Sequence, residues 1–485
     1  MEVDTSISHP ISLDDLIKEV RLDISNTPVD IEENSDKNNI PFNSLMKIIK
    51  KYKFFPSLQV KKFFSNDSLI LLHNTYKRYD VSSFQQLYDE CRSVVLDLNA
   101  QDGKNVVVTF AQSIPDRMNI EEFSKVADTI SYSETSFEGT VITVYKYNDE
   151  WYYGTTSCPT VNSSRYFHPT KTHGVMFDEA IARITGDDIP TNRDESNALR
   201  TKFSDTYLDS VKAYAFVLVH YENRHIIDYT DTLGENYTKL VHIVTRNRDS
   251  FQDESLSNMP FAHIGIIYPT PFVMPQHAID YLNTAPNAYA ILSKTIEGKL
   301  IKVSKQEIIS REEKDLGNPN IWHNMLHVYM QNKPIYKIND YLKEFNLTVT
   351  NPISSRGFEL DPTYIIHTVI CNMRDVLYNL FKSTLKFYNV ETKRYVINRD
   401  ADNALAPIIR FHLIQLRNIQ VSTHIHAPLN PKVVYHYICH HQTMKNIRLL
   451  IHYFATSWID GNNLNGIKPM AAESFKLLDK LLSQR

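Results

Sequence analysis

The sequence predicts an α+β protein in which a strand-rich, antiparallel region is followed by an α-helical C-terminal domain. Between residues 41 and 310, short runs of β-branched and aromatic residues alternate with turn pairs such as Asn148-Asp149 and Glu297-Gly298. After residue 311, apolar residues recur at spacings of three and four, most clearly in the segment 362–388 that follows Asp361. We therefore expect one domain over 41–310 and a second over 311–485.

The first 40 residues form an acidic leader. They hold ten acidic and three basic side chains, whereas the whole chain has a net charge of −4. The segment ISLDDLIKEVRL predicts one short helix that Ser12 can cap, lying on its own domain or docking on a partner. The polar segment NTPVDIEENSDKNN after it predicts a linker.

Composition limits the class of protein. A hydrophobic content of 42%, with 28 Tyr and 23 Phe, is enough for sizeable cores. The four cysteines are far apart and follow no signal-like apolar segment, which favours a reducing, cytoplasmic compartment. No apolar stretch approaches the length that a spanning helix needs, so we expect no contact with a membrane. The sequence contains no glycine-rich phosphate loop, and its mild charge is not that of a dedicated nucleic-acid-binding domain.

The secondary-structure elements follow in order from these patterns. Strands are expected at 68–81, 90–99, 104–111, 139–148, 150–158, 213–221, 224–229, 239–246, 263–270, 288–295 and 299–305. Helices are expected at 173–184, 274–284, 362–388, 406–416, 432–454 and 470–482. The strands precede most of the helices, which is the order typical of an α+β fold.

Several segments carry a resemblance to a known family. YDECRSVVLDLN and ETSFEGTVITVYKYNDEWYYGTTS, with HYENRHII and AYAILSKTIEGKLIKVSK after them, resemble the catalytic domain of bacteriophage-type RNA ligases that repair tRNA breaks. Glu90, Cys91 and Arg92 match the family's E-C-R-G motif, and Ser93 replaces its glycine. The resemblance covers residues 60–305 and implies an antiparallel-sheet nucleotidyltransferase core, RNA ligase-like in shape.

The chemistry of that family needs charged side chains. A lysine attacks the α-phosphorus of ATP, carboxylates bind the ribose and a divalent metal, and terminal lysines neutralise the triphosphate. When Glu138-Gly139 is placed on the family's D-G pair, the resemblance assigns uncharged residues to four of these positions. They are Ser136 (nucleophile), Val217 (ribose-side glutamate), Asn287 (metal-side glutamate) and Ser304 (second terminal lysine).

The pattern therefore implies a catalytically degenerate relative. The nucleotide- or phosphate-binding remnants are Arg92, Glu138, Gly139, Arg224 and Lys302. We expect no catalytic residues and no cofactor, and a role in binding nucleic acid or as a scaffold in an assembly. An active RNA ligase that uses ATP and Mg²⁺, with Lys125 or Lys146 as a displaced nucleophile, is the alternative.

Basic residues suggest where RNA or another nucleic acid could bind. Basic side chains beside stacking rings suit a single strand, although a solvated helix face explains the C-terminal series equally well. The candidate contacts are Arg165, Lys171, Arg374, Lys382, Lys386 and Arg394.

Two further patterns bear on partners and metals. His436, Cys439 and His440 have spacings that zinc can use, but they lie in an amphipathic pattern, so we expect core or surface histidines and no metal. The Asn-, Ile-, Lys- and Tyr-rich texture resembles proteins of large cytoplasmic DNA viruses. A third reading is thus a virion or assembly component that binds other proteins and never touches nucleic acid.

Overall fold

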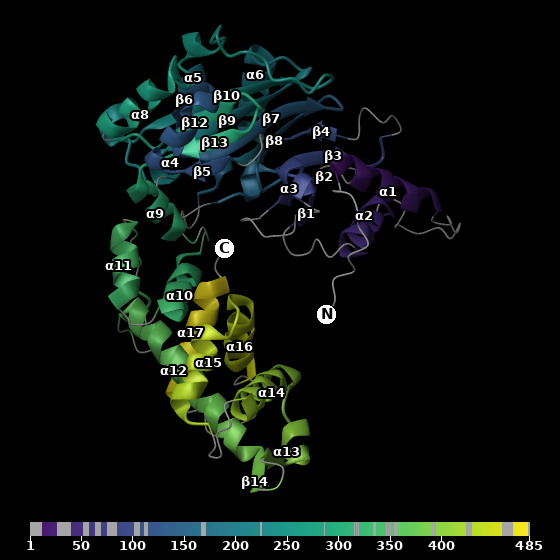
Figure 1. Ribbon diagram of the computed structural model, residues 1–485, viewed down its shortest axis with the longest axis vertical. Coiled ribbons are helices and arrows are strands. Elements are labelled where there is room, and N and C mark those ends of the chain that lie inside the picture. Colours follow the sequence, from purple (N-terminus) through teal and green to yellow (C-terminus); the bar gives the residue numbers. More distant parts are fainter. Residues whose placement is uncertain are drawn as a thin grey trace. The chain divides into compact units, whose positions relative to one another are not determined.

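The computed structural model divides the chain into two compact units, residues 1–315 and 316–485 (Figure 1). The described residues are 12–26, 40–51, 58–63, 69–74, 85–100, 107–110, 115–165, 171–223, 226–285, 287–314, 316, 318, 320–332, 336–345, 347, 349, 351–353, 357, 359–389, 391, 394–422, 429–457 and 469–483.

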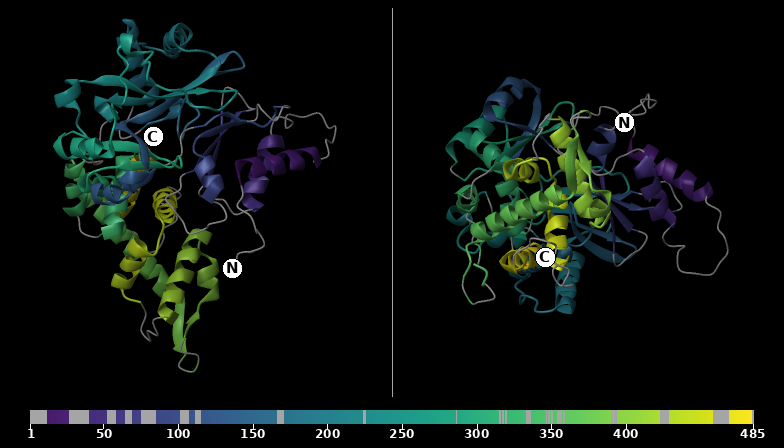
Figure 2. Two further views of the ribbon diagram at one scale, coloured as in Figure 1. Left: turned by 45° about the horizontal axis from the view of Figure 1, so that its top comes forward. Right: turned by 90° about the horizontal axis from the view of Figure 1, so that it is seen from below.

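The first unit begins with two helices and a four-stranded antiparallel sheet. The elements are α1 (Leu13–Asn26), α2 (Ile40–Lys51), β1 (Leu58–Lys62), β2 (Leu69–Asn74), α3 (Gln85–Glu90), β3 (Val94–Asp97) and β4 (Val107–Thr109). Figure 2 shows the purple helices α1 and α2 side by side. The apolar side of α1 is buried in the core that this sheet shares with both helices. The helix predicted in the leader is thus present and lies on its own unit, whereas the predicted linker falls outside the described residues.

A second antiparallel sheet, in the order β10-β9-β7-β8, forms the middle of the unit. Its strands are β7 (Thr140–Tyr147), β8 (Glu150–Thr155), β9 (Lys212–His220) and β10 (Thr238–Asn247). Helices α5 (His173–Thr185) and α6 (Arg193–Tyr207) bury their apolar residues against it. Both residues of the predicted turn between β7 and β8 have positive φ, 47° at Asn148 and 63° at Asp149, as a two-residue hairpin turn requires.

The third sheet has the order β11-β6-β12-β13-β5 and is antiparallel except where β5 pairs with β13. Its elements are β5 (Asp116–Met118), β6 (Ile130–Ser136), β11 (Pro271–Phe272), β12 (Ala290–Thr295) and β13 (Leu300–Val303). Helices α4 (Ile120–Val126) and α8 (Pro275–Thr284) share its core, and α9 (Gln306–Lys314) follows β13.

The second unit is almost entirely helical. It contains α10 (Ile321–Asn332), α11 (Tyr336–Glu344), α12 (Pro362–Ser383), α13 (Arg399–Asn403), α14 (Pro407–Ser422), α15 (Pro431–His440), α16 (Met444–Ser457) and α17 (Pro469–Ser483). A hairpin of β14 (Leu385–Asn389) and β15 (Arg394–Ile397) follows α12. The long helix α12 begins after Asp361, whose carboxylate accepts hydrogen bonds from two backbone N–H groups of the first turn. The apolar side of α12 lies in a large hydrophobic core of this unit.

The fold class predicted from the sequence is confirmed as α+β, with antiparallel sheets followed by helices. Two predicted strands are wrong. Residues 263–270 contain the end of a 3-10 helix and a single bridge, Val241 to Ile267, instead of a strand. The described part of 224–229 is also not a strand, because the Ile227 N–H donates to the Glu138 carboxylate and not to a neighbouring strand. No helix among the described residues is long and apolar enough to cross a membrane.

Candidate functional site

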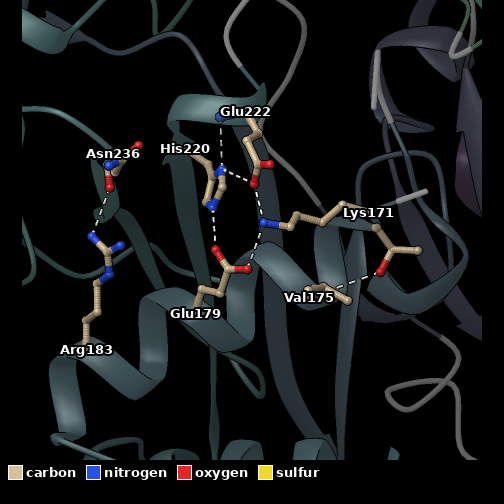
Figure 3. Close-up of polar contacts among 8 residues, drawn as sticks. Lys171, Val175, Glu179, Arg183, His220, Glu222 and Asn236 are labelled. Carbon is tan, nitrogen blue, oxygen red and sulfur yellow. Dashed lines mark hydrogen bonds and ion pairs between the residues drawn. The ribbon is translucent and has the colours of Figure 1, made fainter. Parts of the chain in front are cut away.

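The first candidate site is a cluster of charged side chains where α5 meets the end of β9 (Figure 3). The Lys171 ammonium forms an ion pair with Glu179 Oε1 at 2.8 Å and also contacts Glu222 Oε2. His220 Nε2 lies 2.8 Å from Glu179 Oε2, and the Glu222 N–H donates to His220 Nδ1 at 3.1 Å. The His220 side chain is fully buried. Glu179, His220 and Glu222 each offer one possible metal-ligand atom, and these atoms lie within 4.8 Å of one another.

The charge states of this cluster follow from its contacts. Burial lowers the pKa of His220, and its hydrogen bond to Glu179 only partly opposes this effect. Because Nδ1 already accepts a hydrogen bond, the neutral imidazole carries its proton on Nε2 and donates it to Glu179. Burial opposes the ionisation of both Glu179 and Lys171. Hydrogen bonds from Lys171 and His220 nevertheless lower the pKa of Glu179, and hydrogen bonds to Glu179 and Glu222 raise the pKa of Lys171.

A polar network of uncharged groups lies beside the cluster. His173, the first residue of α5, lies with Nε2 3.1 Å from Thr140 Oγ1 and 3.3 Å from Asn223 Oδ1. Its Nδ1 lies 2.8 Å from Ser164 Oγ. Burial lowers the pKa of His173 to about 4, so this histidine is neutral and structural at neutral pH.

The second candidate site is a buried ion network between β13 and α9. Lys302 Nζ donates to Glu312 Oε1 at 2.5 Å and to Tyr289 Oη at 2.6 Å. Tyr289 donates to the same carboxylate oxygen at 2.5 Å, and Arg117 Nη1 lies 3.2 Å from Glu312 Oε2. Burial alone would raise the pKa of Glu312, but Lys302, Tyr289 and Arg117 together hold it below its ordinary value.

Glu138 and Gly139, predicted as nucleotide-binding remnants, have internal partners. Glu138 Oε2 accepts the Ile227 N–H at 2.7 Å, and the Glu138 N–H donates to Tyr229 Oη at 2.8 Å. A Cβ atom at Gly139 would lie 2.4 Å from the Leu218 carbonyl oxygen. Glycine is thus required here by the close approach of β7 to β9.

The positions that the resemblance assigns to lost catalytic residues lie in strands or directly beside them. Ser136 ends β6 opposite Ala290 of β12, and Val217 is buried in the middle of β9. Asn287 lies in the turn before β12, and the Ser304 N–H donates to the Met118 carbonyl oxygen after β13.

The remaining predicted residues are dispersed. Arg92 precedes β3, where burial lowers its pKa, and Arg224 lies outside the described residues. Lys125, one of the two alternative nucleophiles, is exposed on α4. The other, Lys146, lies over the Trp151 ring and 3.8 Å from Asp205.

The candidate nucleic-acid contacts fall in both units, with Arg165 and Lys171 in the first and the other four in the second. Arg165 follows a 3-10 helix, Lys171 is held in the ion cluster, and Arg374 pairs with Asp375. Lys382 and Lys386 are exposed at the end of α12 and on β14. Arg394 begins β15, but its side chain lies outside the described part of the chain.

The structure also contains functional candidates that sequence reasoning missed, namely Glu179, His220 and Glu222 in the first site and Arg117, Tyr289 and Glu312 in the second. Among the described residues, the His436, Cys439 and His440 group does not form a set of converging metal ligands. The rings of His436 and His440 instead lie 4.4 Å apart on α15, where Cys439 is buried in the core.

Comparisons with known proteins find similarity to several solved structures. No family model and no curated protein matches the chain. A candidate ATP-dependent DNA ligase from Aquifex aeolicus has a TM-score of 0.36 at 12% identity, over 62% of this chain and 70% of that one. An archaeal ATP-dependent RNA ligase has a TM-score of 0.36 at 9% identity, over 61% and 69%.

The third structure is an RNA ligase variant of Naegleria gruberi with ATP and Mn, which has a TM-score of 0.27 at 9% identity, over 53% of this chain and 97% of that one. TM-scores this far below 0.5 establish neither a shared fold nor a shared activity. The function of this chain therefore has to be inferred from its own residues.

Proposed function

We propose that this protein binds single-stranded nucleic acid without transferring a nucleotide, as a non-catalytic relative of RNA ligases. The observation that carries the proposal is the pairing of Lys302 with Glu312 in a buried network. In the RNA ligases that the sequence resembles, two terminal lysines neutralise the triphosphate of ATP. Lys302 matches one of them, and Ser304 replaces the other. Here an internal carboxylate already holds the ammonium group.

The energetics of the network oppose a nucleotide phosphate. The side chains of Lys302 and Glu312 are only 12% and 8% exposed. A phosphate could reach Lys302 only by displacing the carboxylate, which would leave Glu312 buried with fewer partners, at a cost of about 3 to 5 kcal/mol. Ser136, at the position of the nucleophile, has no amine that could form a phosphoramidate.

The binding half of the proposal rests on the second unit. Lys382 and Lys386 are exposed at the end of α12 and on β14, and the Lys382 ammonium lies 5.6 Å from the centre of the Tyr378 ring. Phe387, the next residue of β14, is 58% exposed. Exposed rings beside cations are the groups that stack bases and contact phosphates in a single strand. In this proposal the two units are separate domains, with boundaries near residues 41 and 310.

The test of the non-catalytic half is a labelling experiment. The protein is incubated with labelled ATP or GTP and Mg²⁺ or Mn²⁺, then denatured. We expect no covalent label. A label that survives denaturation and disappears in Lys125→Ala or Lys146→Ala would establish the active-ligase alternative.

The test of the binding half is a titration of labelled single-stranded RNA at several salt concentrations. Each phosphate contact contributes about 0.7 to the slope of log affinity against log salt, so Lys382→Ala with Lys386→Ala should lower that slope by about 1.4. Lys432→Ala, an exposed lysine on α15 of the same unit, is the matched control and should leave the slope unchanged. No binding by the wild-type protein at low salt would favour the assembly-component reading instead.

A further inference from the structure

Helix α14 is apolar on two opposite sides. Its inward side lies in the hydrophobic core of the second unit through Ile409, Leu413 and Leu416. Its outward side is also largely apolar, where a helix on a protein surface normally carries charged residues. The outward stripe consists of Phe411 (45% exposed), Ile414 (48%), Asn418, which is also exposed, and Val421 (42%).

Another helix of the same unit shows the ordinary pattern. The exposed residues in the middle of α17 are Glu473, Lys476 and Lys480, and all three are charged. Single exposed apolar residues are common on proteins, whereas several that adjoin on one surface mark a site of interaction with another molecule. The outward stripe of α14 is therefore a candidate interface.

The spacing of the outward stripe indicates that its partner is also a helix. The four residues follow one another at intervals of three, four and three positions. This is the spacing of the contact positions a and d in a coiled coil, and it places Asn418 at an a position. At about 1.5 Å per residue, the 16 residues of α14 allow a contact about 24 Å long.

The asparagine in the stripe points to a second copy of this chain as the partner. An amide side chain both donates and accepts hydrogen bonds, so it can pair with an identical amide. In a parallel pair of identical helices, each a position faces the same position of the other helix. Asn418 then meets Asn418 of the second copy, whereas an apolar partner residue would leave the buried amide without hydrogen bonds.

The charges beside the stripe favour the same parallel arrangement. Arg410 and Arg417 lie along one edge of the stripe, and Gln415 lies along the other edge. In a parallel pair, the edge with the arginines faces the edge of the second copy that carries Gln415, whereas an antiparallel pair would bring the two arginine edges together. Arg417 is also paired with Asp402 of its own chain.

We propose that α14 is a dimerisation helix, which pairs in parallel with α14 of a second copy of this chain, with Asn418 of the two copies in contact. A contact about 24 Å long on a helix about 10 Å wide buries less than the total of about 1,200 Å² that a standard interface needs. The dimer should therefore dissociate on dilution through the micromolar range. The proposal is independent of the nucleic-acid-binding function, because Lys382 and Lys386 are not part of α14.

The first experiment is sedimentation equilibrium of the full-length protein at a series of concentrations. We expect an equilibrium between one and two chains. Ile414→Glu should raise the Kd of the dimer by at least about 100-fold, because each dimer would bury two carboxylates without partners. Leu449→Glu is the matched control, since Leu449 is a similarly exposed apolar residue (47%) on α16, and it should leave the Kd unchanged.

A cross-linking variant tests the parallel arrangement, and it still decides the matter if Ile414→Glu fails to fold. Asn418→Cys places the thiols of the two copies side by side in a parallel pair, so mild oxidation should join two chains through this residue. Lys476→Cys, on the charged side of α17, is the control and should not join them. Mass spectrometry of the linked peptides identifies the residue in each case.

Several outcomes would overturn the proposal. A wild-type protein that stays monomeric at every concentration would exclude the second copy and leave a helix of another protein as the occupant of the stripe. A dimer that Ile414→Glu leaves intact, or that Leu449→Glu weakens equally, would lie on a different surface. A dimer in which Asn418→Cys does not cross-link would contradict the parallel pairing.

Discussion

Replacing Glu312 by alanine tests whether the network between β13 and α9 is a true buried ion pair. The substitution removes the carboxylate that accepts from Lys302 and Tyr289, each at 2.5 Å, and leaves the ammonium with the Tyr289 hydroxyl alone. Removing one partner of a buried pair costs about 3 to 5 kcal/mol. The loss of the Arg117 contact adds little, because that side chain is 52% exposed and such contacts contribute about 0 to 1 kcal/mol.

The pH dependence of this loss has a definite sign. Burial already lowers the pKa of Lys302, and removal of Glu312 lowers it further. The unfolded lysine then holds its proton at pH values where the folded lysine has lost it, so the stability of the variant rises with pH up to about 10.4, the ordinary lysine pKa. The deficit of Glu312→Ala relative to wild type should therefore shrink between pH 7 and pH 10.

The assay must report on the first unit alone, because two units need not unfold together. Hydrogen exchange of peptides covering β12 and β13, measured with increasing urea, gives the local free energy of opening. Glu313→Ala is the matched control, since Glu313 is the exposed neighbour on α9, and it should stay within about 0.5 kcal/mol of wild type. A Glu312→Ala variant as stable as this control would refute the reasoning.

Three other predictions concern the first unit. Gly139→Ala should lower the free energy of unfolding by about 1 to 3 kcal/mol in a urea titration, because its Cβ would meet Leu218 O at 2.4 Å and Val217 Cγ1 at 2.7 Å; an unchanged midpoint would contradict the close approach. Ser93 has a φ of 58°, so Ser93→Val should be destabilising by about 1 kcal/mol or more, whereas Ser93→Gly should not; equal melting temperatures for both variants would count against this. Burial lowers the pKa of His242 to about 4. As the pH is lowered from 6.5 to 4, the unfolded chain therefore takes up a proton that the folded chain does not, and the free energy of unfolding decreases. His242→Phe should flatten this slope, and an unaltered slope would exclude His242 as its source.

The architecture was predictable where local patterns decide the structure. The β7–β8 turn at Asn148-Asp149 and the helix that starts after Asp361 follow from turn and capping chemistry, and both are present. The run 263–270 was misjudged because its apolar residues fill the core without pairing as a strand. Gly265, with a φ of 85°, ends a 3-10 helix there instead.

The candidate sites were not predictable to the same extent. Glu179 and His220 are 41 positions apart in the sequence, and only the folding of α5 onto β9 brings them into contact. The one local signal was His220 and Glu222 at a spacing of two, which also describes any pair on one side of a strand. Lys302 was recognised from its motif position, but its partner Glu312 lies on a helix in which nothing marks that residue as buried.

Two consecutive residues of α5 hold different partners, and the two sets of contacts together restrict rotation of the helix. Asp178 holds Arg200 of α6 through hydrogen bonds of 2.6 and 2.9 Å, while Glu179 holds Lys171 and His220. A rotation of α5 about its axis would disturb both sets of contacts. Loss of the Asp178–Arg200 pair should therefore shift Glu179 and change the geometry of the charged cluster at the end of β9. Neither Asp178 nor Arg200 is itself a member of that cluster.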